Sequence, residues 1–169
     1  MGRADMIAAR PCECPAPAAD LHHLDNMKPE PGKTIRRALE GRGVALNQPA
    51  DSQEIRELQK ILGISLDTLL RDLFNEFDGF KSCDERSVID LWPIQRTIKE
   101  KHLAKIIDGK QYHPIGDLLI DSDFVMCCLE RQSEPVFLLY DEWKMASTAE
   151  KFFEKLVSGA FDPVSPRSL

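Results

Sequence analysis

Hydrophobic positions in the first half of the chain recur every three or four residues, the spacing of an α-helix with one buried face. This spacing predicts a short helix over residues 34–42, a second over 51–63 and a third over 67–79. Asp51 or Ser52 is placed to cap the second helix, and Gly63 is placed to end it. The third helix has the widest apolar stripe, formed by Leu66, Leu69, Leu70, Leu73, Phe74 and Phe77.

The second half of the chain is typical of a β-sheet, with short apolar runs separated by turn residues. Between the first two strands, residues 94–107 roughly keep helical spacing and predict another helix. Near-continuous apolar runs favour strands that are covered on both faces, or on one face with weak alternation. Cys127 and Cys128 lie on one predicted strand, so their side chains should point to opposite faces, as small buried residues. The predicted strands are 87–92, 112–120, 124–129 and 136–140.

A last amphipathic helix is predicted over residues 148–157, with Ser147 or Thr148 as its cap and Gly159 at its end. The order of elements predicts an α+β domain, with N-terminal helices, a central and mainly antiparallel sheet of about four to six strands, and a closing C-terminal helix. Helices followed by a run of strands do not fit a doubly wound nucleotide-binding sheet.

The length of 169 residues suits one domain with tails. Prolines among alanines predict a disordered, proline-rich tail over residues 1–32, followed by a folded domain over 33–160 and a flexible C-terminus over 161–169. Met27 is an alternative start, which leaves open whether residues 1–26 belong to the natural protein.

The net charge and the number of cysteines limit the ligands and the cellular location that we expect. With 22 basic and 28 acidic residues the net charge is −6, which argues against a dedicated nucleic-acid binder. No stretch has the length and apolar character of a signal peptide or a membrane-spanning helix, so we expect no membrane association. Five cysteines do not read as a closed disulfide framework, and we expect a reduced, cytoplasmic location.

The segment over residues 51–80 resembles the opening of the SUKH superfamily, which takes in Smi/Knr-type regulators, Syd and many bacterial immunity proteins. An acidic helix precedes the pair Leu62-Gly63, and Asp78-Gly79 matches the closing turn, although Asp67 stands where the family usually has proline. Residues 90–94, Asp-Leu-Trp-Pro-Ile, and the closing Phe-x-x-x-Leu helix continue the likeness. The resemblance implies a domain that binds another protein, and suggests an immunity protein that neutralises a cognate bacterial toxin.

Two alternatives stay open. One is a regulatory or scaffold protein of the Smi/Knr type. The other is a small metal-dependent enzyme that uses His102, His113 and carboxylates. No phosphate-binding loop, dinucleotide fingerprint or nucleophile elbow is present in the sequence, so we expect no catalytic residue, no metal and no cofactor.

The sequence also predicts a partner surface. Asp141-Glu142-Trp143 joins charge to a large aromatic ring on a predicted turn, the combination found at binding anchors. Acidic residues on or near strands would steer a basic partner. We expect the partner to be a protein, namely a toxin domain. We expect the chain itself to be a monomer or weak dimer that binds no nucleic acid. The predicted contact residues are Trp92, Asp117, Asp121, Asp123, Asp141, Glu142 and Trp143.

Overall fold

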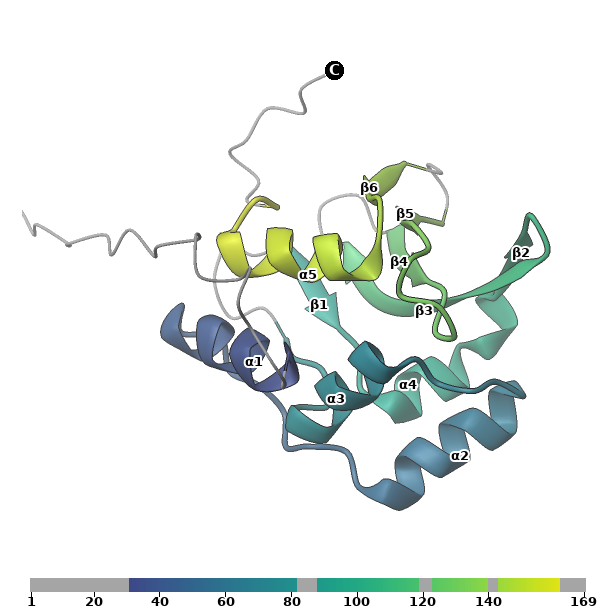
Figure 1. Cartoon of the computed structure of the whole chain (residues 1–169), viewed down its shortest axis with the longest axis horizontal. Helices are drawn as coiled ribbons and strands as arrows, with labels where there is room; N and C mark the ends of the chain where they lie inside the picture. The colour runs from purple at the N-terminus through teal and green to yellow at the C-terminus, as the bar shows by residue number, and fades with distance from the viewer. Residues whose placement is uncertain (1–30, 82–87, 119–122, 140–142, 162–169) are drawn as a thin grey trace, which may run out of the picture.

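The computed structural model describes residues 31–81, 88–118, 123–139 and 143–161, and it confirms the predicted α+β class (Figure 1). Every helix within these ranges is too short or too polar to cross a membrane. In chain order the elements are α1 (Pro31–Gly41), α2 (Ser52–Leu62), α3 (Thr68–Glu76), β1 (Ile89–Leu91), α4 (Ile94–Lys99), the 3-10 turn η2 (Lys101–Leu103), β2 (Lys105–Ile107), β3 (Lys110–Leu118), β4 (Asp123–Cys127), β5 (Val136–Leu138), β6 (Lys144–Ala146) and α5 (Ala149–Ser158).

The ends of α2 follow the sequence signals. The Asp51 carboxylate accepts hydrogen bonds from the backbone N–H groups of Gln53 and Glu54, and the Glu54 side chain accepts one from the Asp51 N–H. This capping box satisfies N–H groups that a helix start leaves without partners. Gly63 ends α2 with φ +69°, a left-handed conformation that favours glycine.

Helix α1 begins earlier than the sequence pattern suggests. It starts at Pro31, so its first two residues fall inside the segment expected to be a tail. Proline suits the first helical position because its missing N–H would have no helical partner there. Gly32 lies against the backbone of α3: a Cβ added at Gly32 would be 2.5 Å from the Asp72 carbonyl oxygen. Glycine therefore sets how closely α1 approaches α3.

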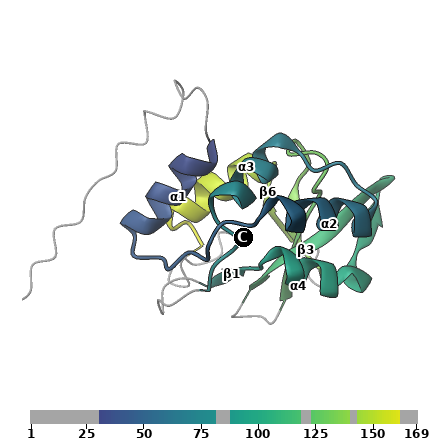
Figure 2. The same cartoon turned by 90° about the horizontal axis from the view of Figure 1, so that it is seen from below.

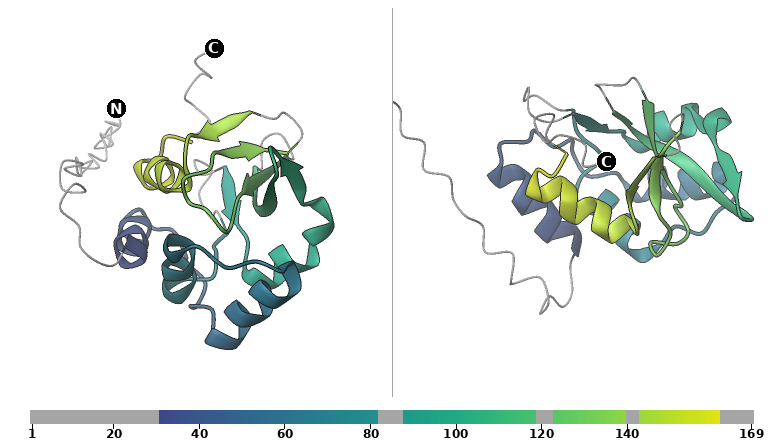
Figure 3. Two further views of the ribbon diagram at one scale, coloured as in Figure 1. Left: turned by 45° about the vertical axis from the view of Figure 1, so that its right-hand side comes forward. Right: turned by 90° about the horizontal axis from the view of Figure 1, so that it is seen from above.

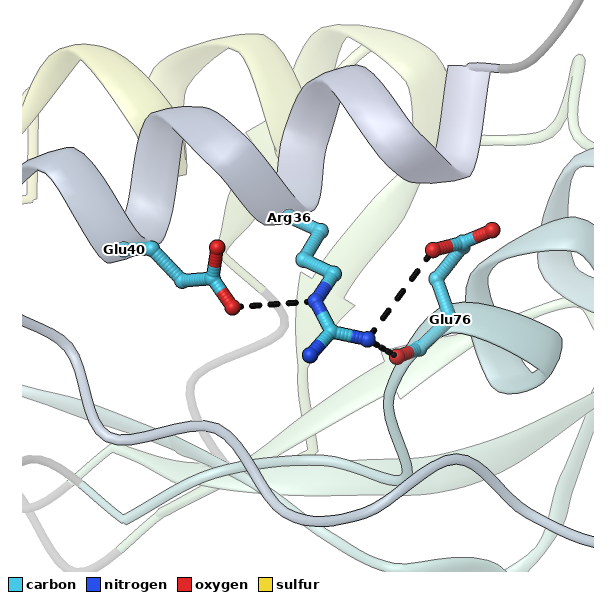
Figure 4. A network of polar contacts seen from close by, with 3 residues as sticks. All are labelled: Arg36, Glu40 and Glu76. Carbon is cyan, nitrogen blue, oxygen red and sulfur yellow. Dashed lines mark hydrogen bonds and ion pairs between the residues drawn. The ribbon is translucent and has the colours of Figure 1, made fainter.

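Arg36 fixes the same contact from the next turn of α1 (Figure 4). Its Nη1 donates to the Glu76 carbonyl oxygen at 2.7 Å, and its Nε lies 2.9 Å from Oε1 of Glu40. The Glu76 carbonyl belongs to the last turn of α3, where carbonyls lack helical partners and attract positive charge. One guanidinium thus joins the end of α3 to the middle of α1.

The described strands form an antiparallel sheet in the order β1-β3-β4-β5-β6, and β2 pairs with β3 outside that path. Residues 116–118 of β3 pair with β1, and residues 110–112 pair with β2. A bulge between Pro114 and Gly116 separates the two paired stretches. Proline is tolerated here because bulges relax the demand for ladder hydrogen bonds.

The helix predicted over residues 94–107 is wrong in its second half. Helix α4 ends at Lys99, and a 3-10 turn leads into strand β2. The aliphatic residues Ile106 and Ile107 belong to that strand rather than to a helical face. Strand β6 was also missed, because three residues give no readable alternation.

Two apolar clusters lie on opposite faces of the sheet. The larger one is built by the helices with one sheet face, and α1, α3 and α5 lie side by side in it (Figures 2 and 3). The smaller one contains Tyr112, Met126, Cys128 and Leu139. Cys127 joins the larger cluster and Cys128 the smaller, both as free buried thiols, so the predicted alternation is confirmed.

Helix α5 follows its sequence signals closely. The Thr148 hydroxyl accepts a hydrogen bond from the Lys151 N–H, and Gly159 ends the helix in the left-handed conformation at φ +76°. Beyond it, the Phe161 ring lies 5.4 Å from the ring of Phe152. Phe161 therefore packs on the core although its segment was expected to be flexible.

Candidate protein-binding surface

Trp92, expected at the partner surface, is only 2% exposed. Its ring meets Phe124 edge-on, with 5.6 Å between the centroids, and the guanidinium of Arg96 lies 4.1 Å from the Trp92 centroid. Trp92 follows the last residue of β1, and only Pro93 separates it from α4, whose first turn brings Arg96 over the ring. A ring this buried offers no surface to a partner, which corrects the expectation for Trp92.

Asp117 and Asp123 are also engaged within the chain. The two Asp117 oxygens lie 2.8 Å and 3.1 Å from the two terminal nitrogens of Arg96, a bidentate pair that leaves little charge for a partner. Asp123 is 2% exposed, and its carboxylate accepts a hydrogen bond from the Phe124 N–H at 2.6 Å. It opens strand β4 rather than standing in a solvated turn, so it does not offer its carboxylate at the surface.

Trp143, the aromatic residue of the predicted binding anchor, is exposed to solvent. Trp143 is 49% exposed and lies immediately before strand β6. Its carbonyl accepts a hydrogen bond from the Leu138 N–H at 2.9 Å, which holds the backbone at the end of the β5–β6 connection. Asp121, Asp141 and Glu142 lie outside the described residues. Trp143 is thus the one predicted contact residue that the described structure places at the surface with a large apolar side chain.

Beside β6 the sheet carries a hollow of about 390 Å³. Its lining residues come from the β2–β3 hairpin, the β4–β5 connection and the start of β6, and they are Ile107, Asp108, Lys110, Tyr112, Glu134, Pro135 and Lys144. Lys110 Nζ lies 2.7 Å from Oε2 of Glu134, so one ion pair crosses the hollow. Burial, with a smaller contribution from the Glu134 charge, raises the pKa of Tyr112 to about 12, and the phenol stays protonated at neutral pH.

The sequence did not indicate this hollow, because the helix predicted over residues 94–107 includes strand β2, which supplies Ile107 to one wall. The same error hid Ile106, which is 76% exposed on β2. A clue was available in the pair Asp108-Gly109, a frequent two-residue hairpin turn. Both residues have positive φ, 50° and 73°, as such a turn requires.

Asp78 acts inside the fold. Its carboxylate Oδ1 accepts a hydrogen bond from the Ile94 N–H at 2.8 Å, at the start of α4. Its backbone N–H donates to the Gln48 carbonyl, and the Asn47 side chain donates to the Asp78 carbonyl. Burial raises the pKa of Asp78 to about 6, against the opposing effect of the Ile94 hydrogen bond. The Asp-Gly turn therefore joins three segments of the domain.

The two histidines of the enzyme alternative occupy different environments. His102 is exposed on η2, with Nε2 3.8 Å from Oε2 of Glu100. His113 is 1% exposed, and neither ring nitrogen has a hydrogen-bond partner among the described residues. Burial lowers the pKa of His113 below its usual value, although the Glu130 charge acts in the other direction. Over the described ranges, no three His, Cys, Asp or Glu side chains form a group that can hold a metal ion.

These features define a small α+β domain whose helices cover one face of an antiparallel sheet. The chain belongs to the SMI1 / KNR4 family (SUKH-1), whose sequence model matches residues 49–157, more than half of the chain. The suspected SUKH relationship is thereby confirmed. The match runs from just before α2 to the last turn of α5, and α1 lies outside it. A comparison with curated proteins finds no match.

Proposed function

We propose that this SUKH-1 domain works by binding another protein rather than by catalysis, and that its partner is a bacterial toxin domain that it neutralises. Family membership supports the first part, because the SUKH resemblance implies a protein-binding domain. The second part follows the immunity proteins among the bacterial members of the superfamily. In this proposal the chain acts in the cytoplasm, as a monomer or weak dimer, without a cofactor.

The observation that carries the proposal is the exposure of Trp143. Tryptophan is enriched among the few residues that supply most of the binding energy at interfaces. Trp143 is 49% exposed, and the next residue, Lys144, lines the 390 Å³ hollow. A partner that covers Trp143 would remove apolar area from water and would have polar side chains for orientation close by.

If a neighbouring gene encodes a toxin domain, co-expression of this chain with that domain tests the proposal. The wild-type chain should restore growth, and Trp143→Ala should weaken affinity for the toxin domain about 30-fold or more, the usual effect of removing an interface hot spot of about 2 kcal/mol. Ile61→Ala is the matched control, since Ile61 is another exposed apolar residue, 37% exposed on α2. We expect that control to bind and rescue normally.

Thermal melts of both variants show whether they fold, so a loss of rescue can be assigned to binding. A wild-type chain that binds no such toxin and fails to restore growth refutes the immunity role. Equal affinity of the wild-type and Trp143→Ala chains refutes the surface assignment and leaves the immunity role standing.

A further inference from the structure

Strand β2 has an outer edge on which, among the described residues, the backbone groups of Ile106 have no hydrogen-bond partner. It is joined to β3 by the two-residue turn Asp108-Gly109, so Ile107 and Lys110, which flank the turn, form a hydrogen-bonded pair. Hydrogen-bonded and non-hydrogen-bonded pairs alternate in an antiparallel ladder. Ile106, opposite Gln111, is therefore in a non-hydrogen-bonded pair, and its N–H and C=O point away from β3.

The chain itself covers part of the other two edges of the sheet, at β1 and β6. Phe80 and Leu91 exchange two backbone hydrogen bonds, of 2.9 Å and 3.0 Å, along the outer side of β1. On β6, the Met145 carbonyl accepts a hydrogen bond from Lys155 Nζ at 2.8 Å. Ile106 differs: its side chain is 76% exposed, and within the described part of the chain no hydrogen bond to its backbone is found beyond the β2 ladder. Figure 1 shows β2 at the outer end of the sheet.

The charge around this edge is opposite in sign to that of the chain. Residues 99–110 contain four lysines against Glu100 and Asp108, whereas the whole chain has a net charge of −6. Lys99 and Lys101 are exposed just before β2. Lys110 is already paired with Glu134, so the positive charge that faces solvent lies mainly at the α4–β2 end.

We propose that the β2 edge binds an extended, acidic segment of the partner protein, which joins the sheet as an additional strand. This inference deepens the proposed function and rests on it. The Ile106 N–H and C=O would supply backbone hydrogen bonds, and the exposed Ile106 side chain would pack on an apolar neighbour in the added strand. Carboxylates of the segment would face Lys99 and Lys101. A second copy of this chain is the poorer occupant, because its own edge carries the same lysines.

An NMR titration of the full chain tests this site. The probe is a capped seven-residue peptide of alternating glutamate and valine, and the control peptide alternates lysine and valine. The acidic peptide should shift the Ile106 amide signal and slow its hydrogen exchange about tenfold or more, with an affinity that falls as salt is added. The lysine peptide should leave the signal unchanged.

Ile106→Pro and Ile106→Val form the variant pair. Proline removes the outward N–H but no β2–β3 hydrogen bond, so the hairpin signals of Gly109 and Tyr112 should persist while peptide binding is lost. The valine variant should bind like the wild type. Binding that survives Ile106→Pro, equal responses to both peptides, or no response at Ile106 overturns the inference. Concentration-dependent shifts at Ile106 without peptide assign the edge to a second copy and also overturn it.

Growth rescue separates the two proposals. If the wild-type chain fails to rescue while Ile106 still responds to the acidic peptide, the immunity role fails and the acidic-segment site remains. If Ile106→Pro rescues as well as the wild type and the peptide gives no response, the site fails and the immunity role remains.

Discussion

Two glycines of helix α1 should respond in opposite ways to the same substitution. Gly32 and Gly41 lie near the two ends of the helix, and neither has a positive φ. In Gly32→Ala the new methyl group would be 2.5 Å from the Asp72 carbonyl oxygen and 2.8 Å from the carbonyl carbon. In Gly41→Ala the methyl group would have no neighbour within 4 Å among the described residues.

These distances set the expected change in the free energy of unfolding for each variant. Alanine in place of glycine favours a helix by up to about 1 kcal/mol, and by less near the ends. Relieving a contact of 2.5 Å against backbone requires α1 to move away from α3, and overpacking of this kind costs about 1–3 kcal/mol. The displacement would also stretch the bond from Arg36 to the Glu76 carbonyl. We expect a net loss of about 1–2 kcal/mol for Gly32→Ala and a change between zero and about 1 kcal/mol of gain for Gly41→Ala.

Urea denaturation followed by tryptophan fluorescence measures both values, because Trp92 is buried in the native state. The difference between the two variants is the informative quantity, since both change the same residue type in the same helix. A Gly32→Ala chain as stable as Gly41→Ala would contradict the close approach of α1 to α3. It would mean that α1 does not dock on the domain as described.

Three further substitutions test the interior, and a fourth, Gly63→Ala, is the control for the first of them. Gly79→Ala adds a methyl group at φ +75° and 2.5 Å from the backbone of β1, so the free energy of unfolding should fall by about 3 kcal/mol or more. Gly63→Ala, at φ +69° with no described atom within 4 Å, should lose only about 1–2 kcal/mol. Urea denaturation compares the two variants. Asp78→Asn keeps an acceptor for the Ile94 N–H but removes a buried charge. Because the native pKa of Asp78 is raised from 3.8 to about 6, the wild type gains stability from this group as pH falls from above 6 to below 3.8. Melts at pH 8 should show Asp78→Asn more stable by about 1–2 kcal/mol, less than the full shift because solvent screens part of the charge, and the absence of any gain would contradict the buried carboxylate. His113 has a lowered native pKa, so its contribution is complete above about pH 6.5 and is lost as pH falls below that value. His113→Phe should flatten this acid-side loss between pH 7 and 5, and an unchanged pH profile would show that the imidazole is not buried in its neutral form.

The helical half of the fold was readable because its signals are local. Asp51 and Gly63 mark the ends of α2 through their own side chain and backbone freedom, and the stripe over 67–79 needs only one buried face. The stretch 94–107 was not readable, since four isoleucines and a leucine satisfy helical spacing while β2 depends on pairing with β3. Short strands are set by their partners, which a local pattern does not contain.

The candidate surface was predicted less well than the fold. Trp92 looked like an anchor because aromatic character is visible in a sequence, whereas its cover by Arg96 and Phe124 arises only from tertiary packing. Asp123 looked solvated because its neighbours are polar, yet it is buried and its carboxylate accepts a hydrogen bond from the Phe124 N–H. Trp143 is exposed, and its role as a partner contact stays a prediction.

The attachment of β2 to β3 alone has a consequence for local opening. Three residue pairs hold the strand, and it shares no ladder with any other described strand, so the hairpin can separate without breaking β1 or β4. Units held this weakly open at free energies well below that of global unfolding, and their amides exchange with solvent first. A partner strand added at Ile106 would therefore order a weakly held corner of the sheet, and hydrogen exchange at this hairpin would report a bound partner.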